Sequence, residues 1–331
     1  MKKNEIRYNP FWGRSVVIAS NRQSRPWSGE LSELEGEKLL PYDPDCYLCP
    51  GNKRAGGKVN PDYTDTWSFA NDFPSLDFSI QSKVSTETPY MSMPANGICE
   101  VLIYSPDHSK SLSTMDVSNI VKVTDMWQET YSRLESHSEI DYVLIFENRG
   151  MIMGNSQPHP HGQVYAYTEI PDLIARHQIF EFQKTEECFV CKTNEFEKKG
   201  VKRIVSSNDS FLAFVPFAAT LPYEVIITPV KHYRDITELS TKDKRSLAQI
   251  LKQVLTGLDN LFNIPFHYTL AIVQSPTDGN DYDYHFQIHI VSLLRGPGIR
   301  KHIVGADMFG YSINPSDPDV CAEEIRKAVG K

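Results

Sequence analysis

The chain has 331 residues, of which 40% are hydrophobic and 23% charged, and its formal net charge is −8. A chain of this length can bury a large core and is expected to form two domain-sized units. The acidic balance offers no general attraction for nucleic acid or an anionic membrane, no apolar run reaches a membrane span, and the polar start Met1–Ile6 does not resemble a signal peptide. These features predict a cytoplasmic protein with no nucleic-acid or membrane partner.

Along the chain, the same order of elements occurs twice. The first half has a Cys-x-x-Cys pair, a strand, a helix, further strands and a His-x-His segment, and the second half repeats this order with His-x-Gln-x-His at its end. In the first half the strands are predicted at 100–105, 142–147 and 163–167, and the apolar period of the helix runs from Ile120 to Leu134. In the second half the strands are predicted at 211–215, 224–228, 269–274 and 286–292, with the helix period from Leu247 to Leu261.

This repeat predicts an α+β fold of two tandem units, each an antiparallel sheet covered by one long helix. Gly, Pro and polar residues at 50–64, 86–97 and 275–283 indicate loops. The stretch 169–187 has no strong strand signal and is the expected boundary, which gives an N-terminal half of residues 1–170 and a C-terminal half of residues 171–331.

The two Cys-x-x-Cys pairs are candidate zinc sites, because such a turn directs two thiolates to one point and two histidines can complete a tetrahedron. A histidine follows the strand in each half, and another begins each terminal motif. The alternative is that these are core cysteines, redox pairs and hydrogen-bonded histidines. We predict one or two zinc ions, with the first site formed by Cys46, Cys49, His108 and His159 and the second by Cys188, Cys191, His232 and His285.

The segment Ser156–Gln163, with the sequence Ser-Gln-Pro-His-Pro-His-Gly-Gln, contains the candidate nucleophile, His161. An imidazole attacks phosphorus readily and its phosphoramidate is labile, so a fixed neutral histidine can accept a nucleotidyl group and pass it on. Ser156 and Gln163 can stabilise the phosphate. The second half has Gln287 where the first has His161, which predicts that only the first half performs chemistry; the alternative for His161 is a further metal ligand or a buried hydrogen-bonded histidine.

These motifs resemble the galactose-1-phosphate uridylyltransferase family, a branch of the histidine-triad superfamily, over nearly the whole chain. The matching segments are 7–10, 21–27, 46–52, 60–63, 69–73 and 146–163. The resemblance implies two histidine-triad-like repeats and a homodimer. It also implies a ping-pong reaction in which His161 takes UMP from a UDP-sugar and transfers it to a hexose 1-phosphate.

Matched residue by residue, the resemblance also implies a substrate site. Its residues are Asn71 and Asp72 at the uridine and ribose, Asn148, Gly154, Ser156 and Gln163 at the phosphates, Arg22 and Arg25 as phosphate-binding arginines from across a dimer, and Lys301, Val304, Gly305 and Asp307 at the hexose. The residue types of Asn71 and Asp72 also favour a simple turn, and the arginines can equally belong to a solvated surface. The hexose segment has Ala306 and Asp307 where the family typically has Tyr and Glu, with no matching Gln beyond, which predicts room for a different or modified sugar.

Two alternatives remain from the sequence. The first is a phosphorylase or adenylyltransferase that acts on an ADP-sugar through His161, because the second Cys-x-x-Cys pair also occurs in nucleotide-sugar phosphorylase relatives. A non-catalytic zinc protein that binds nucleotides is the other.

Overall fold

The computed structural model describes residues 4–22, 39–79, 89–175, 187–282 and 284–330. Its elements in chain order are β1 (Glu5–Asn9), β2 (Arg14–Ile18), η1 (Ser20–Arg22), β3 (Trp67–Ala70), β4 (Gly97–Ile103), α1 (Val117–Glu135), β5 (Tyr142–Arg149), η2 (Met151–Met153), β6 (His161–Tyr167), α2 (Asp172–Ile174), α4 (Phe189–Gly200), β7 (Ile204–Ser207), β8 (Phe211–Phe214), β9 (Val225–Pro229), η4 (Ile236–Glu238), α5 (Thr241–Phe262), β10 (Tyr268–Val273), β11 (Gln287–Val291), β12 (Leu294–Gly296), β13 (Ile299–Arg300), α6 (Gly305–Phe309), β14 (Ser312–Asn314) and α7 (Pro318–Val329).

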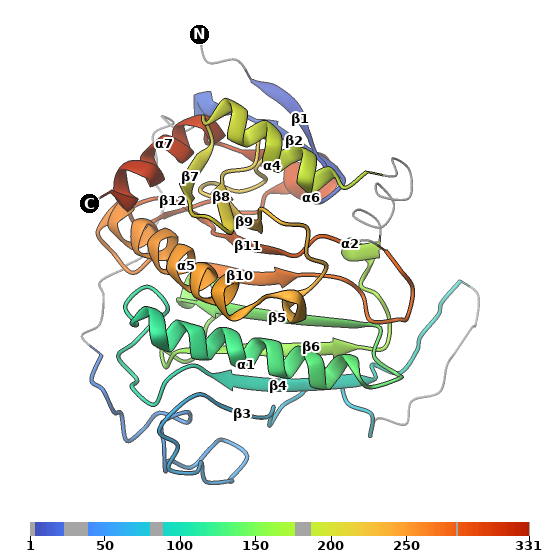
Figure 1. The fold of residues 1–331 in the computed structure, drawn as a ribbon, viewed down its shortest axis with the longest axis vertical. Helices are drawn as coiled ribbons and strands as arrows, with labels where there is room; N and C mark the ends of the chain where they lie inside the picture. Colours follow the sequence, from blue (N-terminus) through green and yellow to red (C-terminus); the bar gives the residue numbers. More distant parts are fainter. Residues whose placement is uncertain (1–3, 23–38, 80–88, 176–186, 283, 331) are drawn as a thin grey trace.

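A nine-stranded sheet forms the centre of the molecule, in the order β3-β4-β6-β5-β10-β11-β9-β8-β7 (Figure 1). Every neighbouring pair in it is antiparallel. The first four strands come from the first half of the chain and the other five from the second half. Read outwards from the β5–β10 seam, the order β5-β6-β4-β3 is repeated as β10-β11-β9-β8, so the two repeats lie in one continuous sheet with pseudo-twofold symmetry.

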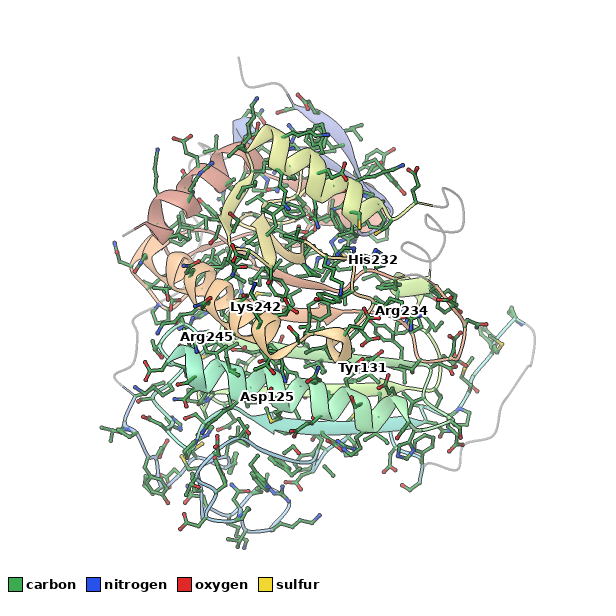
Figure 2. All side chains as sticks on the ribbon, viewed as in Figure 1. Asp125, Tyr131, His232, Arg234, Lys242 and Arg245 are labelled. Atoms are coloured by element: carbon green, nitrogen blue, oxygen red, sulfur yellow. The ribbon has the colours of Figure 1, made fainter. Side chains whose placement is uncertain are left out.

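The two long predicted helices are α1 and α5, and both cover the same face of the sheet (Figure 1). The apolar residues that indicated the first helix are buried, among them Ile120, Trp127 and Leu134. The second helix begins at a capping box made by Ser240 and Asp243. Asp125 on α1, labelled in Figure 2, forms an ion pair with Lys244 on α5. Lys244 also donates to Gln128 (2.9 Å). The two helices therefore form one layer over both repeats.

The N-terminal strands do not join the sheet of the first half. β2 pairs in parallel with β14, close to the C-terminus, and β1 pairs with β2. The side chains of Arg7 and Asn9 donate to the carbonyl oxygens of Phe217 and Ala218. Residues 5–18 therefore pack on the second half of the chain.

Among the described residues, no helix is both long enough and apolar enough for a membrane crossing.

Candidate functional site

The first predicted metal cluster is assembled at one end of β4 and β6. The ligand atoms of Cys46, Cys49, His108 and His159 all lie within 4.8 Å of one another, and all four residues are buried. His159 faces the cluster through Nδ1, while its Nε2 is 2.8 Å from the carbonyl oxygen of Ser105. That carbonyl fixes the proton on Nε2 and leaves the Nδ1 lone pair for a metal.

The second predicted cluster has the same form. Cys188, Cys191, His232 and His285 present ligand atoms within 4.8 Å of one another. Cys188 caps the N-terminus of α4, where its sulfur accepts a hydrogen bond from the Cys191 backbone N–H (3.5 Å). The pKa of the Cys188 thiol is strongly lowered, chiefly by a hydrogen bond from the Cys191 side chain; burial opposes this, and hydrogen bonds from both histidines add to the lowering.

Both clusters fit a tetrahedral zinc ion. Bonds of about 2.3 Å to sulfur and 2.05 Å to nitrogen place tetrahedral ligands about 3.6 Å apart for a sulfur–nitrogen pair and about 3.3 Å apart for two nitrogens. In the first cluster the sulfur of Cys49 is 3.6 and 3.5 Å from the Nδ1 atoms of His108 and His159, which are 3.4 Å from each other. In the second, the sulfur of Cys191 is 3.4 Å from the Nδ1 atoms of both His232 and His285, and the sulfur of Cys188 is 3.4 Å from that of His285. Burial also raises the pKa of the Cys46 thiol to about 12, so a cation is what would keep that sulfur ionised.

His161 is the first residue of β6, an interior strand between β4 and β5. Pro160 lies in the bend just before this strand, which is why a residue without an N–H is tolerated there. The Nδ1 atom of His161 is 2.8 Å from the carbonyl oxygen of His159. A carbonyl only accepts, so Nδ1 carries the proton and Nε2 has a free lone pair. Burial lowers the pKa of His161, which keeps the ring neutral.

Two further residues that were predicted to bind substrate lie with His161 on the face of the sheet opposite α1 and α5. Along β6, His161 and Gln163 are half-buried and alternate with buried Gly162 and Val164, which face the helices. On β5, Phe146 pairs with Gln163, and Asn148 lies two residues further along the same face. The structure therefore brings His161, Gln163 and Asn148 to one surface.

The loop from β5 to β6 carries the remaining predicted phosphate contacts. Gly154 has a φ of +82°, and a Cβ added there would meet no atom within 4 Å. Ser156 is exposed in the same loop, which leads directly into His159 and His161. Gly154 and Ser156 are therefore both accessible to a ligand bound at the first half of the chain.

Asn71 and Asp72 follow β3 at the edge of the sheet. The Asn71 side chain accepts from the backbone N–H of Phe73 (2.9 Å), which is the turn contact that its residue type favoured. Asp72 is 3.2 Å from the Nε of Arg54, a buried guanidinium that also lies over the ring of Phe69 (4.0 Å). Arg54 was not among the predicted residues, because a single arginine in a loop gives no signal of its partners.

Arg22 and the predicted hexose segment come together elsewhere. They line a cavity of about 110 Å³ whose walls include five basic or imidazole side chains, Arg22, Arg295, Arg300, Lys301 and His302, together with Val304 and Asp307. Gly305 begins α6 beside it. Arg25 lies outside the described residues. In Figure 1, α6, which packs on β14, lies at the end of the molecule that carries β1 and β2, whereas β6 lies between β5 and β4 towards the other end.

The second half reproduces the geometry around His161, but its counterpart, Gln287, has no imidazole. Gln287, the first residue of β11, donates from Nε2 to the carbonyl oxygen of His285 (3.1 Å), as His161 does to that of His159. His289 stands in the place of Gln163, and the rings of Trp12 and Phe11 cover it at centroid distances of 4.5 and 5.9 Å. Both Gln287 and His289 are buried.

Comparisons with known proteins agree with this arrangement. The family model for the N-terminal domain of galactose-1-phosphate uridyl transferase matches residues 1–171, and the model for its C-terminal domain matches residues 175–329. The chain belongs to the galactose-1-phosphate uridyl transferase family.

Individual members of the family match over nearly their whole length. The galactose-1-phosphate uridylyltransferase of Haemophilus influenzae is 35% identical over 97% of this chain and 93% of its own. A solved uridylyltransferase structure is 27% identical, with a TM-score of 0.77 and 99% of both chains covered. An ADP-glucose phosphorylase from Arabidopsis thaliana with bound ADP-glucose is 23% identical, with a TM-score of 0.78 and 98% and 99% of the two chains covered, and it shares the fold.

Within this uridyl transferase fold, Asp307 has a clear intramolecular role. Its carboxylate accepts from the Lys301 ammonium (2.7 Å) and from the backbone N–H groups of Ile313 (2.9 Å) and Val304 (3.1 Å). Burial raises the pKa of Asp307, but these donors outweigh it and the pKa is lowered overall. The shorter acid at this position thus holds the lysine and the start of α6 in place.

Proposed function

We propose that this protein transfers UMP from a UDP-sugar to a hexose 1-phosphate through a covalent uridylyl-His161. The observation that carries the proposal is the contact between His161 Nδ1 and the His159 carbonyl, which leaves Nε2 as a neutral nucleophile. Family membership and the placement of Gln163 and Asn148 on the same face support it.

Each half-reaction exchanges one bond at the α-phosphorus. In the first, the Nε2 lone pair attacks the phosphorus, the bond to the bridging oxygen breaks, and the sugar 1-phosphate leaves with that electron pair. In the second, an oxygen of the acceptor phosphate attacks, the P–N bond breaks, and its electrons return to Nε2. The Nδ1 proton stays in place throughout, where the His159 carbonyl stabilises the positive charge of the nucleotidylated ring. The acceptor is already an anion, so no general base is needed.

The direct test is transfer of label from UDP-glucose radiolabelled in the α-phosphate. Wild-type protein should retain label after denaturing gel filtration, and His161→Ala should retain none. His137→Ala, which removes an exposed histidine of the same half, is the matched control and should label like wild type. Label that persists in His161→Ala would exclude this residue as the nucleophile.

We also propose that zinc occupies both cysteine–histidine clusters. The separations of their ligand atoms support this, and zinc in the first cluster would fix His159, whose carbonyl orients His161. Elemental analysis of protein purified without chelator should give close to two zinc ions per chain, and about one in Cys188→Ser. A wild-type content well below one would refute both sites. None of the six cysteines, all of which lie in the described part of the chain, forms a disulfide, which suits the proposed cytoplasmic location.

The acceptor of the nucleotidyl group is to be identified by a screen of candidate acceptors. The second cluster is assembled, and the sequence pattern behind it is shared with phosphorylase relatives, so inorganic phosphate is a competing acceptor. Once the enzyme has been loaded with label, galactose 1-phosphate and phosphate should be compared as acceptors, and UDP-glucose and ADP-glucose as donors. Release of UDP-hexose supports the transferase, and release of a nucleoside diphosphate supports the phosphorylase.

We further propose a homodimer in which the basic cavity of one copy faces the His161 of the other. The elements α6, which borders the cavity, and β6 of the same chain lie towards opposite ends of the molecule (Figure 1), and the arginines and lysine of the cavity suit the phosphate of a sugar 1-phosphate. The repeats of residues 1–170 and 171–331 would then contribute to different active sites. Mixing His161→Ala with Arg300→Ala should restore part of the activity that each variant lacks, because a mixed dimer contains one intact site.

A further inference from the structure

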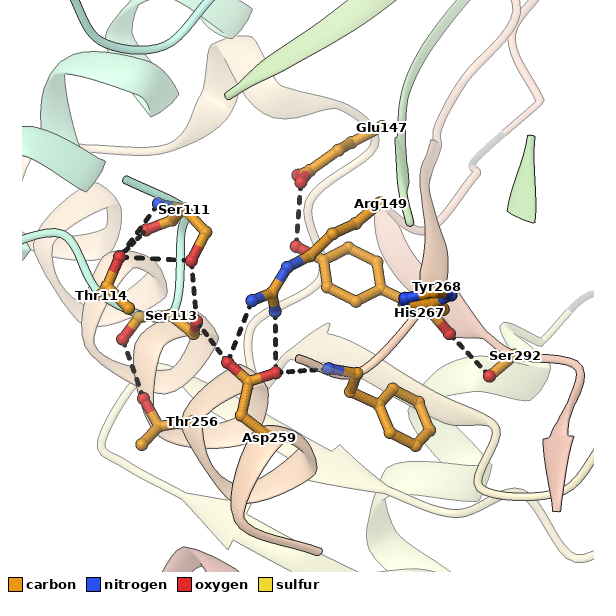
Figure 3. A network of polar contacts seen from close by, with 11 residues as sticks. Ser111, Ser113, Thr114, Glu147, Arg149, Thr256, Asp259, His267, Tyr268 and Ser292 are labelled. Carbon is orange, nitrogen blue, oxygen red and sulfur yellow. Dashed lines mark hydrogen bonds and ion pairs between the residues drawn. The ribbon is translucent and has the colours of Figure 1, made fainter. Parts of the chain in front are cut away.

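The second half of the chain holds the end of β5 residue by residue. Glu147 accepts from the Tyr268 hydroxyl (2.9 Å), and Arg149 forms two hydrogen bonds with Asp259 (2.8 and 3.2 Å), as Figure 3 shows. A Cβ added at Gly150 would lie 2.2 Å from the His267 ring, so this glycine rests directly on the imidazole. Each of these partners comes from α5 or β10, or from the residue just before β10.

Asn148 belongs to this series but faces the other way. Glu147 and Arg149 point to the helix side of the sheet, whereas Asn148 shares the face of His161 and Gln163. Its partner is Thr269, which lies directly opposite it across the β5–β10 seam and donates from Oγ1 to Asn148 Oδ1 (2.8 Å). Thr269, a residue of the second repeat, thus contacts Asn148, which lies on the same face as His161 of the first repeat.

In this contact the oxygen end of the Asn148 amide faces Thr269. The amide has an acceptor oxygen on one side and two N–H donors on the other. Because Thr269 occupies the oxygen, the NH₂ group is the end left to interact on the open face. Phosphate oxygens only accept, so this orientation attracts a phosphate and the flipped one would repel it.

We propose that Thr269 is a positioning residue, which orients Asn148 as a hydrogen-bond donor to the phosphates of the nucleotide substrate. This inference rests on the proposed function, since it assumes a nucleotide at His161. It also gives the second repeat a role in the chemistry of the first, beyond completing the sheet.

The test uses two substitutions at Thr269 that differ in one group. Thr269→Val keeps the branched shape and loses the hydroxyl, whereas Thr269→Ser keeps the hydroxyl. Transfer of UMP, measured as kcat/KM for UDP-glucose, should fall about tenfold in Thr269→Val, the usual effect of one misplaced hydrogen bond to a charged group. Thr269→Ser should stay within about twofold of wild type.

A cycle with Asn148→Ala separates positioning from a general structural effect. If Thr269 acts through Asn148, Thr269→Val should cost almost nothing further in the Asn148→Ala background. An equal loss in both backgrounds, or wild-type activity in Thr269→Val, would overturn the inference. Urea unfolding of each variant controls for loss of fold.

A failure of the proposed function would give a different result from a failure of this inference. In that case wild-type protein takes no label from UDP-glucose, and the inference is tested by calorimetric binding of UMP, whose phosphate needs no covalent step to contact Asn148. Affinity should be several-fold weaker in Thr269→Val and restored in Thr269→Ser. Equal affinity in the three proteins, or no binding by wild type, would count against the inference itself.

Discussion

Gly162, next to the proposed nucleophile, has no space for a side chain. A Cβ at this position would lie 2.1 Å from the Tyr104 hydroxyl and 2.9 Å from the backbone oxygen of Phe146. Gly162→Ala should therefore lower the free energy of unfolding by about 1–3 kcal/mol. It should also displace His161 and reduce label transfer more than tenfold, because small misplacements of a reacting group are costly.

The double variant Gly162→Ala/Tyr104→Phe is the control for this steric cause. Removing the hydroxyl eliminates the closest contact while leaving the ring, so part of the stability and activity should return. Urea unfolding and transfer assays on the four proteins measure both effects. If Tyr104→Phe gives no recovery, the clash with the hydroxyl is not what limits residue 162.

The strand β11 corresponds to β6 in the second repeat, but the residue that matches Gln163 is covered by other side chains. Gln287 is buried and hydrogen-bonded to His289 (2.9 Å), and Phe11 and Trp12 from the turn between β1 and β2 cover that histidine. We therefore expect Gln287→His to create no second nucleophile. A protein carrying both His161→Ala and Gln287→His should take no label from UDP-glucose, and any stable label on it would show that the second repeat is open to nucleotide.

The strands and long helices of the repeat were predictable from the sequence, whereas the contacts between residues far apart in the chain were not. All seven predicted strands and both long helices are confirmed, because their apolar and β-branched residues mark the faces that they bury, which in β8 and β9 are both faces of the strand. The two metal clusters were predictable because each motif has a counterpart in the other half. The position of Phe11 on His289, the contact of Tyr104 with Gly162 and the donation from Thr269 to Asn148 join residues far apart in sequence. No local pattern encodes such pairs.

At the scale of the whole molecule, the two repeats share one core across the β5–β10 seam. Residues from both halves belong to a single hydrophobic cluster between the sheet and the layer of α1 and α5. Arg149 and Asp259 join the halves within that layer, and Asp259 also accepts from Ser113 (2.6 Å) and from the Phe266 backbone (2.7 Å). The halves are therefore expected to unfold together in one transition.

Glu147 at this seam makes the stability of the whole molecule depend on pH. Burial raises its pKa from 4.5 to about 7, although the Tyr268 hydroxyl and Arg149 partly oppose this. Between those two values the unfolded chain has an ionised carboxylate and the folded chain a protonated one, so folding takes up a proton and stability falls as pH rises. Glu147→Gln lacks this proton uptake.

The gain in stability from Glu147→Gln should accordingly grow from near zero at pH 4.5 to as much as about 3 kcal/mol above pH 7. The glutamine oxygen can still accept from Tyr268, which keeps the hydrogen bond that the Glu147 carboxylate makes with that hydroxyl. Urea unfolding at pH 5 and pH 8 measures the difference, with Glu139→Gln, an exposed position in the same half, as the control that should change little at either pH. A difference between Glu147→Gln and wild type that is the same at both pH values would mean that the carboxyl group is not titrating in the folded protein over this range.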